Sequence, residues 1–216
     1  MERQMVTIVD YGVGNLASIA NMARKAGSEC VISGDPQVLA QADRLILPGV
    51  GAFDRAMTNL VERHLIPVLN ERVQQRRVPT LGLCLGMQLF ARGSEEGTRA
   101  GLGWLAADNR RFRFEPMNGN APKVPHMGWN YIEPVSPALL LEGLPPEPRF
   151  YFVHSYHLQC DEAADVMCWT TYGYRFASGI HRGNLWGTQF HPEKSHKFGL
   201  ALLKNFLSSA QASLDV

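Results

Sequence analysis

Residues 79–88 read PTLGLCLGMQ, and this stretch decides how the rest of the chain is interpreted. The apolar residues before Cys84 predict a buried strand, and a helix is expected from about Met87. Between Gly82 and Gly86 the sequence is G-x-C-x-G, the pattern of a nucleophile held at a sharp turn from strand to helix. Glycines are needed there because the turn leaves no room for side chains. The stretch predicts a thiol presented at the carboxyl end of a sheet.

Short apolar runs alternate with helical patterns through the first half of the chain. Strands are expected at 5–9, 29–32, 44–47 and 79–83, and helices at 16–26, 54–64 and 67–76. This alternation predicts a mostly parallel sheet with helices on both faces, an α/β fold of three layers.

The second half differs in composition. Residues 110–149 are rich in Pro, Gly and Asn, with short β-like pieces near 131–132 and 150–153. We interpret this region as antiparallel additions and loops, so residues 1–216 are expected to form one domain. A strand at 185–190 would lead into His191, and apolar residues four apart predict an amphipathic C-terminal helix around 198–206.

Composition excludes several classes of protein. Hydrophobic residues make up 45% of the 216 residues and charged residues 19%, which is typical of a globular chain with a sizeable core. The 21 basic and 20 acidic residues form no long Lys/Arg run, so no nucleic acid is expected as partner. No apolar run approaches the ~18 residues of a membrane span, and we expect a cytoplasmic protein with no membrane partner. The four cysteines lack zinc-site spacing, so thiols and no metal are expected.

A thiolate nucleophile needs a base held in a fixed orientation. His191-Pro192-Glu193 offers both, because the carboxylate of Glu193 could orient the imidazole of His191 while its other nitrogen faces Cys84. The helix after Cys84 would favour the thiolate, and the amide of Leu85 would point at a developing oxyanion. The plain alternatives are a core cysteine and a loop histidine. Together the two motifs favour catalysis.

A competing hypothesis starts at Gly12, Gly14 and Ala17, which match the G-x-G-x-x-A fingerprint of dinucleotide-binding enzymes. An acid is expected near the end of the second strand, but Asp35 comes late, after Gly34. This oxidoreductase hypothesis also leaves Cys84 and His191 unexplained, so it ranks second.

The chain resembles the glutaminase (HisH-type) subunits of imidazole glycerol phosphate synthases, within the class I (triad) glutamine amidotransferases. The resemblance runs from Asp10 to about Ser195. It is carried by D-Y-G-x-G-N at 10–15, PGVGAF at 48–53, GLCLGMQ at 82–88, PHMGWN at 125–130, VHSY at 153–156 and QFHPEKS at 189–195. It implies a flavodoxin-like sheet, no cofactor, and hydrolysis of L-glutamine.

The resemblance also implies a role for each matching residue. Cys84 would form a glutamyl thioester, His191 would protonate the leaving ammonia and then activate water, and Glu193 would orient His191. The oxyanion would be held by Leu85 and, after a peptide reorients, by the strand at residues 49–51 in the PGVGAF motif. In that strand the implied oxyanion residues are Val50 and Gly51. The implied substrate-binding residues are Gly49, Gln88, Ser155 and Tyr156.

A partner follows from the same resemblance. It would be a cyclase or synthase with a (β/α)8 barrel fold, forming a heterodimer and receiving the ammonia through a sealed junction. Asn15 and Lys194 would lie at or near the contact, with a helix cap as the alternative role of Asn15. The implied acceptor belongs to histidine biosynthesis. Residues 179–188 also look like relatives that serve surface-polysaccharide synthesis, and a non-catalytic scaffold of the same fold is a further alternative.

Overall fold

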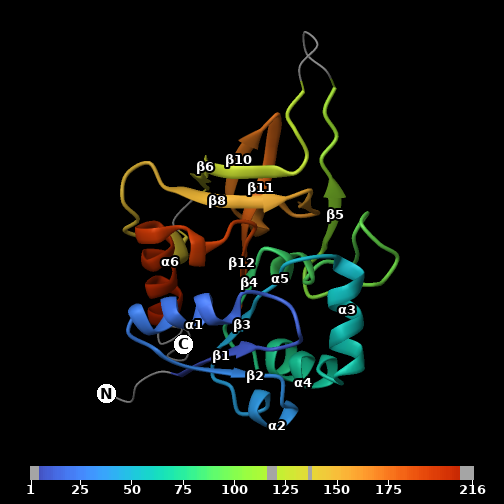
Figure 1. Cartoon of the computed structure of the whole chain (residues 1–216), viewed down its shortest axis with the longest axis vertical. Coiled ribbons are helices and arrows are strands. Elements are labelled where there is room, and N and C mark those ends of the chain that lie inside the picture. The colour runs from blue at the N-terminus through green and yellow to red at the C-terminus, as the bar shows by residue number, and fades with distance from the viewer. Residues whose placement is uncertain (1–4, 116–120, 136–137, 210–216) are drawn as a thin grey trace.

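A computed structural model describes residues 5–115, 121–135 and 138–209 (Figure 1). The strands are β1 (Met5–Val9), β2 (Glu29–Ser33), β3 (Leu45–Leu47), β4 (Thr80–Leu83), β5 (Ala107–Arg111), β6 (His126–Tyr131), β7 (Glu133–Pro134), β8 (Arg149–His154), β9 (Tyr156–Cys160), β10 (Val166–Tyr172), β11 (Tyr174–Arg182) and β12 (Leu185–Thr188). The α-helices are α1 (Leu16–Lys25), α2 (Pro36–Leu39), α3 (Phe53–Glu62), α4 (Ile66–Asn70), α5 (Leu85–Gln88) and α6 (His196–Ser209). Short turns of other helix types are η1 (Glu71–Gln75), η2 (Leu139–Leu141), η3 (Ala163–Asp165) and η4 (Pro192–Lys194).

The parallel part of the sheet has the order β2-β1-β3-β4-β12. Each neighbouring pair in it is parallel, and Gly82 of β4 lies opposite Gly187 of β12. This is the flavodoxin-like order, in which ligands bind at the carboxyl ends of the strands. The predicted three-layer α/β fold is confirmed, and β4 and β12 deliver Cys84 and His191 to the same edge.

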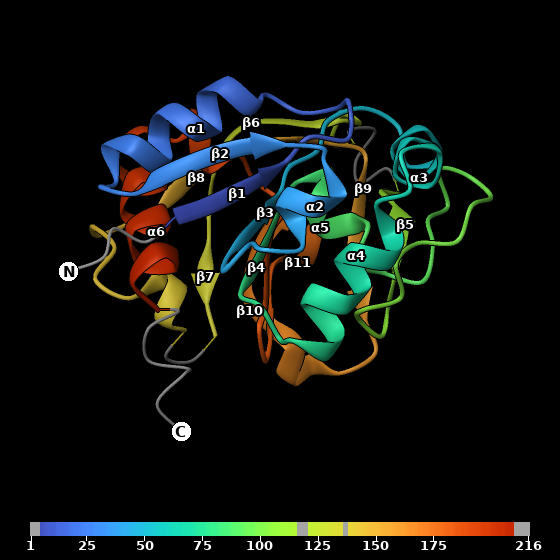
Figure 2. The same ribbon diagram turned by 90° about the horizontal axis from the view of Figure 1, so that it is seen from below.

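Helices cover both faces of this sheet, as Figure 2 shows from below, and an apolar layer lies on each face. The side chains of a strand alternate between its faces, so Leu45 and Leu47 of β3 pack with α3, α4 and α5 while Ile46 packs with α1 and α6. Both layers are continuous cores, and burial on both faces explains why β3 is an uninterrupted apolar run.

The predicted antiparallel additions are also present. β11 pairs antiparallel with β12, β10 and β9, and β5 pairs with β9. β6 and β8 form a separate two-stranded sheet that covers the carboxyl edge of the parallel strands (Figure 1). This second sheet carries two of the motifs quoted above, PHMGWN and the start of VHSY.

Some boundaries differ from those expected. The helix expected at 67–76 begins at Ile66, with Pro67 in its first turn, and continues after Asn70 as the wider turn η1. The helix expected from about Met87 begins at Leu85, directly after Cys84. Within the described residues, no helix combines the length and apolar character needed to cross a membrane.

Candidate active site

Cys84 occupies a backbone conformation that few side chains adopt. Its φ is 52° and its ψ is −110°, between the last residue of β4 and the first of α5. Such strain persists only where the surroundings enforce it. The backbone N–H of Cys84 donates to the carbonyl of Thr188 at 2.7 Å, so β12 holds the turn from the neighbouring strand.

The two glycines of the turn are required by packing. A Cβ on Gly82 would lie 2.7 Å from the backbone of Met87, and one on Gly86 would lie 1.8 Å from the carbonyl oxygen of Leu47. The predicted nucleophile elbow is therefore present. Because α5 has only four residues, its dipole is small, and the neighbouring side chains dominate the electrostatics of the thiol.

His191 follows β12 and is clamped on both sides. Its N–H donates to the carbonyl of Tyr151 on β8 at 2.9 Å, and its own carbonyl accepts from the hydroxyl of Ser195 at 2.6 Å. The carboxylate of Glu193 lies 2.8 Å from Nδ1, and both side chains are only 2% exposed. The other ring nitrogen, Nε2, is buried and has no hydrogen-bond partner within the described part of the chain. The ring is thus oriented by Glu193 and leaves one nitrogen for chemistry.

Burial and two neighbouring groups set the charge of His191. Burial lowers its pKa, but the Cys84 sulfur and the Glu193 carboxylate outweigh burial and raise the pKa to about 10. The raised pKa favours the protonated imidazole at neutral pH. This arrangement can activate a sulfur nucleophile and supply a proton.

A chain of amide side chains leads to the sulfur from another direction. Nε2 of Gln88 donates to the carbonyl of Tyr156 at 2.9 Å and to Oε1 of Gln189 at 3.0 Å. Nε2 of Gln189 in turn lies 3.6 Å from Sγ of Cys84. No role was predicted for Gln189, although it is the first residue of the QFHPEKS motif that carries His191.

A cavity of about 670 Å³ opens over these residues. Of the residues predicted for the site, it is lined by Asn15, Val50, Gly51, Cys84, Leu85, Gln88, Ser155, Tyr156, His191 and Lys194. Glu193 lies behind His191. Gly49 is not among the lining residues, because it packs against Gly86, where an added Cβ would lie 2.6 Å from the backbone nitrogen.

Glu96 also lines the cavity and was not predicted. Its Oε2 accepts from the backbone N–H of Phe53 at 2.8 Å, at the start of α3. Nothing in the local sequence distinguishes Glu96 from Glu95, which pairs with Arg110 and Arg113 instead. Only the fold brings this carboxylate to the cavity.

The glycines of the dinucleotide fingerprint are used for packing. A Cβ on Gly12 would lie 2.8 Å from the Arg63 side chain, and one on Gly14 would lie 3.1 Å from Pro48. Asn15 caps α1 by accepting from the N–H of Ser18 at 3.4 Å, and it also lines the cavity. The helix cap, given above as the alternative role of Asn15, is therefore present, and its contact with a partner stays a prediction.

Comparison with known proteins gives the family. The class-I glutamine amidotransferase model matches residues 7–210. Imidazole glycerol phosphate synthase subunit HisH 2 of Methanococcus maripaludis is 46% identical over 95% of this chain and 100% of its own. The HisH 2 subunit of Pseudomonas aeruginosa is 45% identical over 94% of this chain and 98% of its own.

Solved structures agree on the fold. A putative GMP synthase subunit from Thermoplasma acidophilum superposes with a TM-score of 0.74 at 18% identity, covering 98% of this chain and 96% of its own. At that identity the likeness speaks for the fold alone. The family match and the curated relatives speak for more: the chain is a glutamine amidotransferase of class I and belongs, within that family, with the HisH subunits of imidazole glycerol phosphate synthases.

Proposed function

We propose that this chain hydrolyses L-glutamine to glutamate and ammonia with Cys84, His191 and Glu193, and passes the ammonia to a synthase partner that forms imidazole glycerol phosphate in histidine biosynthesis. The observation that carries the chemistry is the buried contact of 2.8 Å between His191 and Glu193, beside a strained thiol at the end of the next strand. The HisH relatives support the pathway.

The steps follow from the protonation states. The Cys84 thiolate attacks the side-chain amide carbon of glutamine, and the His191 imidazolium gives its proton to the leaving ammonia. The neutral imidazole then takes a proton from water as the water oxygen attacks the thioester carbon. The carbon–sulfur bond breaks, glutamate is released, and the thiolate and imidazolium are restored. Throughout, Glu193 keeps the proton of Nδ1 in place, so Nε2 does the transfer.

An oxyanion hole requires N–H groups beside the sulfur. The amide of Leu85 follows Cys84 directly and supplies one. The second would come from Val50 or Gly51. Gly49 is locked against Gly86, whereas Gly51 has a φ of +96° and no atom within 4 Å of an added Cβ. A reorientation that brings a second N–H to the site would therefore be confined to the peptides after Gly49.

The residues around the cavity suggest how glutamine is held. Both N–H groups of the Gln88 amide are donated to the protein, to Tyr156 and Gln189, so its oxygen is the atom left for the substrate. That oxygen and the carboxylate of Glu96 are acceptors suited to the ammonium group of glutamine. The backbone of Ser155 and Tyr156 would hold the other end.

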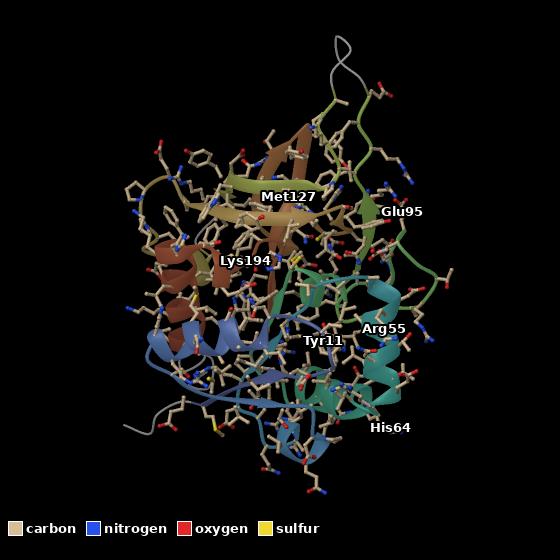
Figure 3. All side chains as sticks on the ribbon, viewed as in Figure 1. Tyr11, Arg55, His64, Glu95, Met127 and Lys194 are labelled. Carbon is tan, nitrogen blue, oxygen red and sulfur yellow. The ribbon has the colours of Figure 1, made fainter. Side chains whose placement is uncertain are left out.

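The partner is expected on the face formed by β6. Met127, Trp129 and Tyr131 alternate along this strand, point to the same face, and are 61%, 45% and 51% exposed. Figure 3 shows Met127 on β6 above Lys194, which lines the cavity. An apolar patch beside the cavity is suited to a heterodimer that seals the ammonia path, with a (β/α)8 barrel as the proposed partner. A catalytic thiol also suits the cytoplasm, the proposed location.

The test uses the complex with the proposed cyclase from the same organism. Cys84→Ala should abolish glutamine-dependent synthesis and leave ammonia-dependent synthesis intact. A variant that still consumed glutamine would refute the nucleophile. If the wild-type chain copurified with a sugar-modifying enzyme and did not bind the cyclase, the proposed role in histidine biosynthesis would be refuted. The proposed hydrolysis of glutamine would not be affected.

A further inference from the structure

Two buried histidines have no part in the chemistry proposed above. His126 on β6 and His154 at the end of β8 lie opposite each other in the two-stranded sheet. Nδ1 of His126 is 3.0 Å from Nε2 of His154, and Nδ1 of His154 is 2.8 Å from the carbonyl oxygen of Tyr156. At the other end, Nδ2 of Asn130 is 3.2 Å from Nε2 of His126. The contacts form one chain that ends at the cavity.

The chemistry of each partner fixes the protons along this chain. A carbonyl oxygen only accepts, so Nδ1 of His154 carries a proton and Nε2 of a neutral His154 must accept. His126 then donates from Nδ1, and its Nε2 accepts from the Asn130 amide. The second N–H of that amide donates to the carbonyl of Thr171 at 3.0 Å, and its oxygen accepts from the N–H of Tyr131 at 2.8 Å. Both histidines are therefore neutral and protonated on Nδ1.

The surroundings favour the neutral forms. The His126 ring stacks on Phe152 at 4.6 Å and on Tyr172 at 4.1 Å, and Phe176 lies 5.3 Å from the His154 ring. Burial among these rings lowers the pKa of His126 to about 4 and the pKa of His154 well below its usual value. At neutral pH neither ring is charged, as the hydrogen-bond chain requires.

This chain of hydrogen bonds ends on the Tyr156 carbonyl, which belongs to the proposed substrate site. The Tyr156 carbonyl accepts from His154 and from Nε2 of Gln88, which fills both of its lone pairs. Gln88 is thereby held with its N–H groups toward the protein and its oxygen toward the cavity. Without the bond from His154, the Tyr156 peptide loses one of the two contacts that orient it, and Gln88 can turn.

We infer that His126 and His154 are positioning residues for glutamine: they fix the Tyr156 carbonyl, and through it the orientation of Gln88. This inference rests on the proposed glutaminase function. It assigns a role to the histidines of PHMGWN and VHSY, whose ring nitrogens bond to each other, to Asn130 and to the Tyr156 carbonyl and not to the sulfur.

The first test needs no activity. Long-range proton–nitrogen correlation spectra of isotope-labelled protein report the tautomer of each histidine. His126 and His154 should both be neutral and protonated on Nδ1 at neutral pH, with assignment from the single His→Asn variants. A charged ring, or a His154 protonated on Nε2, would overturn the inference whatever the enzyme does.

The second test separates binding from chemistry. In His154→Asn the new amide nitrogen takes the place of Nδ1 and can still donate to Tyr156, whereas His154→Gln places its amide near Nε2 and cannot. Loss of that bond should raise KM for glutamine about tenfold in the Gln variant, the effect of one hydrogen bond, and at most about threefold in the Asn variant. The value of kcat and the ammonia-dependent rate should change little in either.

His157 provides the matched control. It is also buried, but its ring bonds to Tyr174 and to the Leu158 carbonyl, not to the substrate site. His157→Gln should lower the melting temperature without changing KM. If His154→Gln leaves KM unchanged, or if both His154 variants lower kcat equally, the inference is wrong. A wild-type complex that consumed no glutamine would instead refute the proposed function, and the spectra would still test the hydrogen-bond chain.

Discussion

Replacing Glu193 with Gln removes one charge from the buried pair and keeps the side-chain size. In the wild type, Glu193 Oε1 lies 2.8 Å from His191 Nδ1. A hydrogen bond to a charged group contributes roughly 1.5–3 kcal/mol and a neutral one about 1 kcal/mol, so the imidazolium should lose about 0.5–2 kcal/mol. Since about 1.4 kcal/mol corresponds to one pKa unit, the pKa of His191 should fall by about one unit. The step in which the neutral imidazole takes a proton from water forms the imidazolium again, so the same loss should lower kcat for glutamine by roughly tenfold.

The sign of the pH effect follows from the same contact. The pKa of His191 is raised in the folded protein to about 10, so its proton is retained at neutral pH and lost as the pH rises through that value. Glu193→Gln should therefore move the alkaline limb of kcat/KM to lower pH. The stabilisation that this pair gives the fold is also present below the ordinary pKa of histidine and lost toward the alkaline limb.

The measurement is glutamine hydrolysis by the complex across neutral to alkaline pH, with ammonia-dependent synthesis as the check on the partner. Glu133→Gln is the control, because Glu133 pairs with Arg175 at 3.1 Å on the surface, where such pairs contribute about 0–1 kcal/mol. It should leave both the rate and the pH profile unchanged. If Glu193→Gln stayed within about twofold of wild type, with its alkaline limb unmoved, the assigned role of the carboxylate would be refuted.

Three further predictions concern the turn at Cys84, the loop after β1 and the exposed face of β6. Gly86→Ala should destabilise the fold by at least about 2 kcal/mol in thermal unfolding, because the added Cβ would lie 1.8 Å from a backbone oxygen of β3, whereas Gly93→Ala, with its nearest atom at 3.9 Å, should have little effect. Tyr11→Phe removes the hydroxyl that donates to the Pro48 carbonyl and should cost about 1 kcal/mol of stability; an unchanged melting temperature would contradict this. Trp129→Ala should weaken binding of the cyclase partner at least about tenfold in calorimetric titration while the chain stays folded; unchanged affinity would place the interface elsewhere.

The residues that the sequence predicted best are those whose neighbours in the chain are also their neighbours in space. The turn at Cys84 and the pair of His191 with Glu193 are local, so spacing and residue type were sufficient to predict each of them. The parallel sheet was predicted for the same reason, since each apolar run and each helix is a local pattern. Local patterns did not predict every contact between residues that are far apart in the chain. Gln88 meets Gln189 from 101 positions away.

The hairpin of β10 and β11 was missed for a different physical reason. Residues 166–168 are buried without alternation, and the pairing register shifts at Val166 and Cys168. A strand that is buried on both faces and carries an irregularity has no period of two to detect. The presence of antiparallel additions was therefore predicted, but only the short pieces near 131–132 and 150–153 were located in the sequence.

The G-x-G-x-x-A pattern after β1 can serve either dinucleotide binding or close packing, and the fold determines which. In the flavodoxin-like strand order, the topological switch point lies between β1 and β3, where a ligand is expected. Here Arg63 and Asn59 of the α3 region close on Gly12, and Pro48 closes on Gly14. The space that stays open extends along the same edge to β4 and β12, over Cys84 and His191. Tight packing at the switch point thus leaves no room for a phosphate there, and Gly14 and Asn15 instead line a cavity whose reactive residues follow the neighbouring strands β4 and β12.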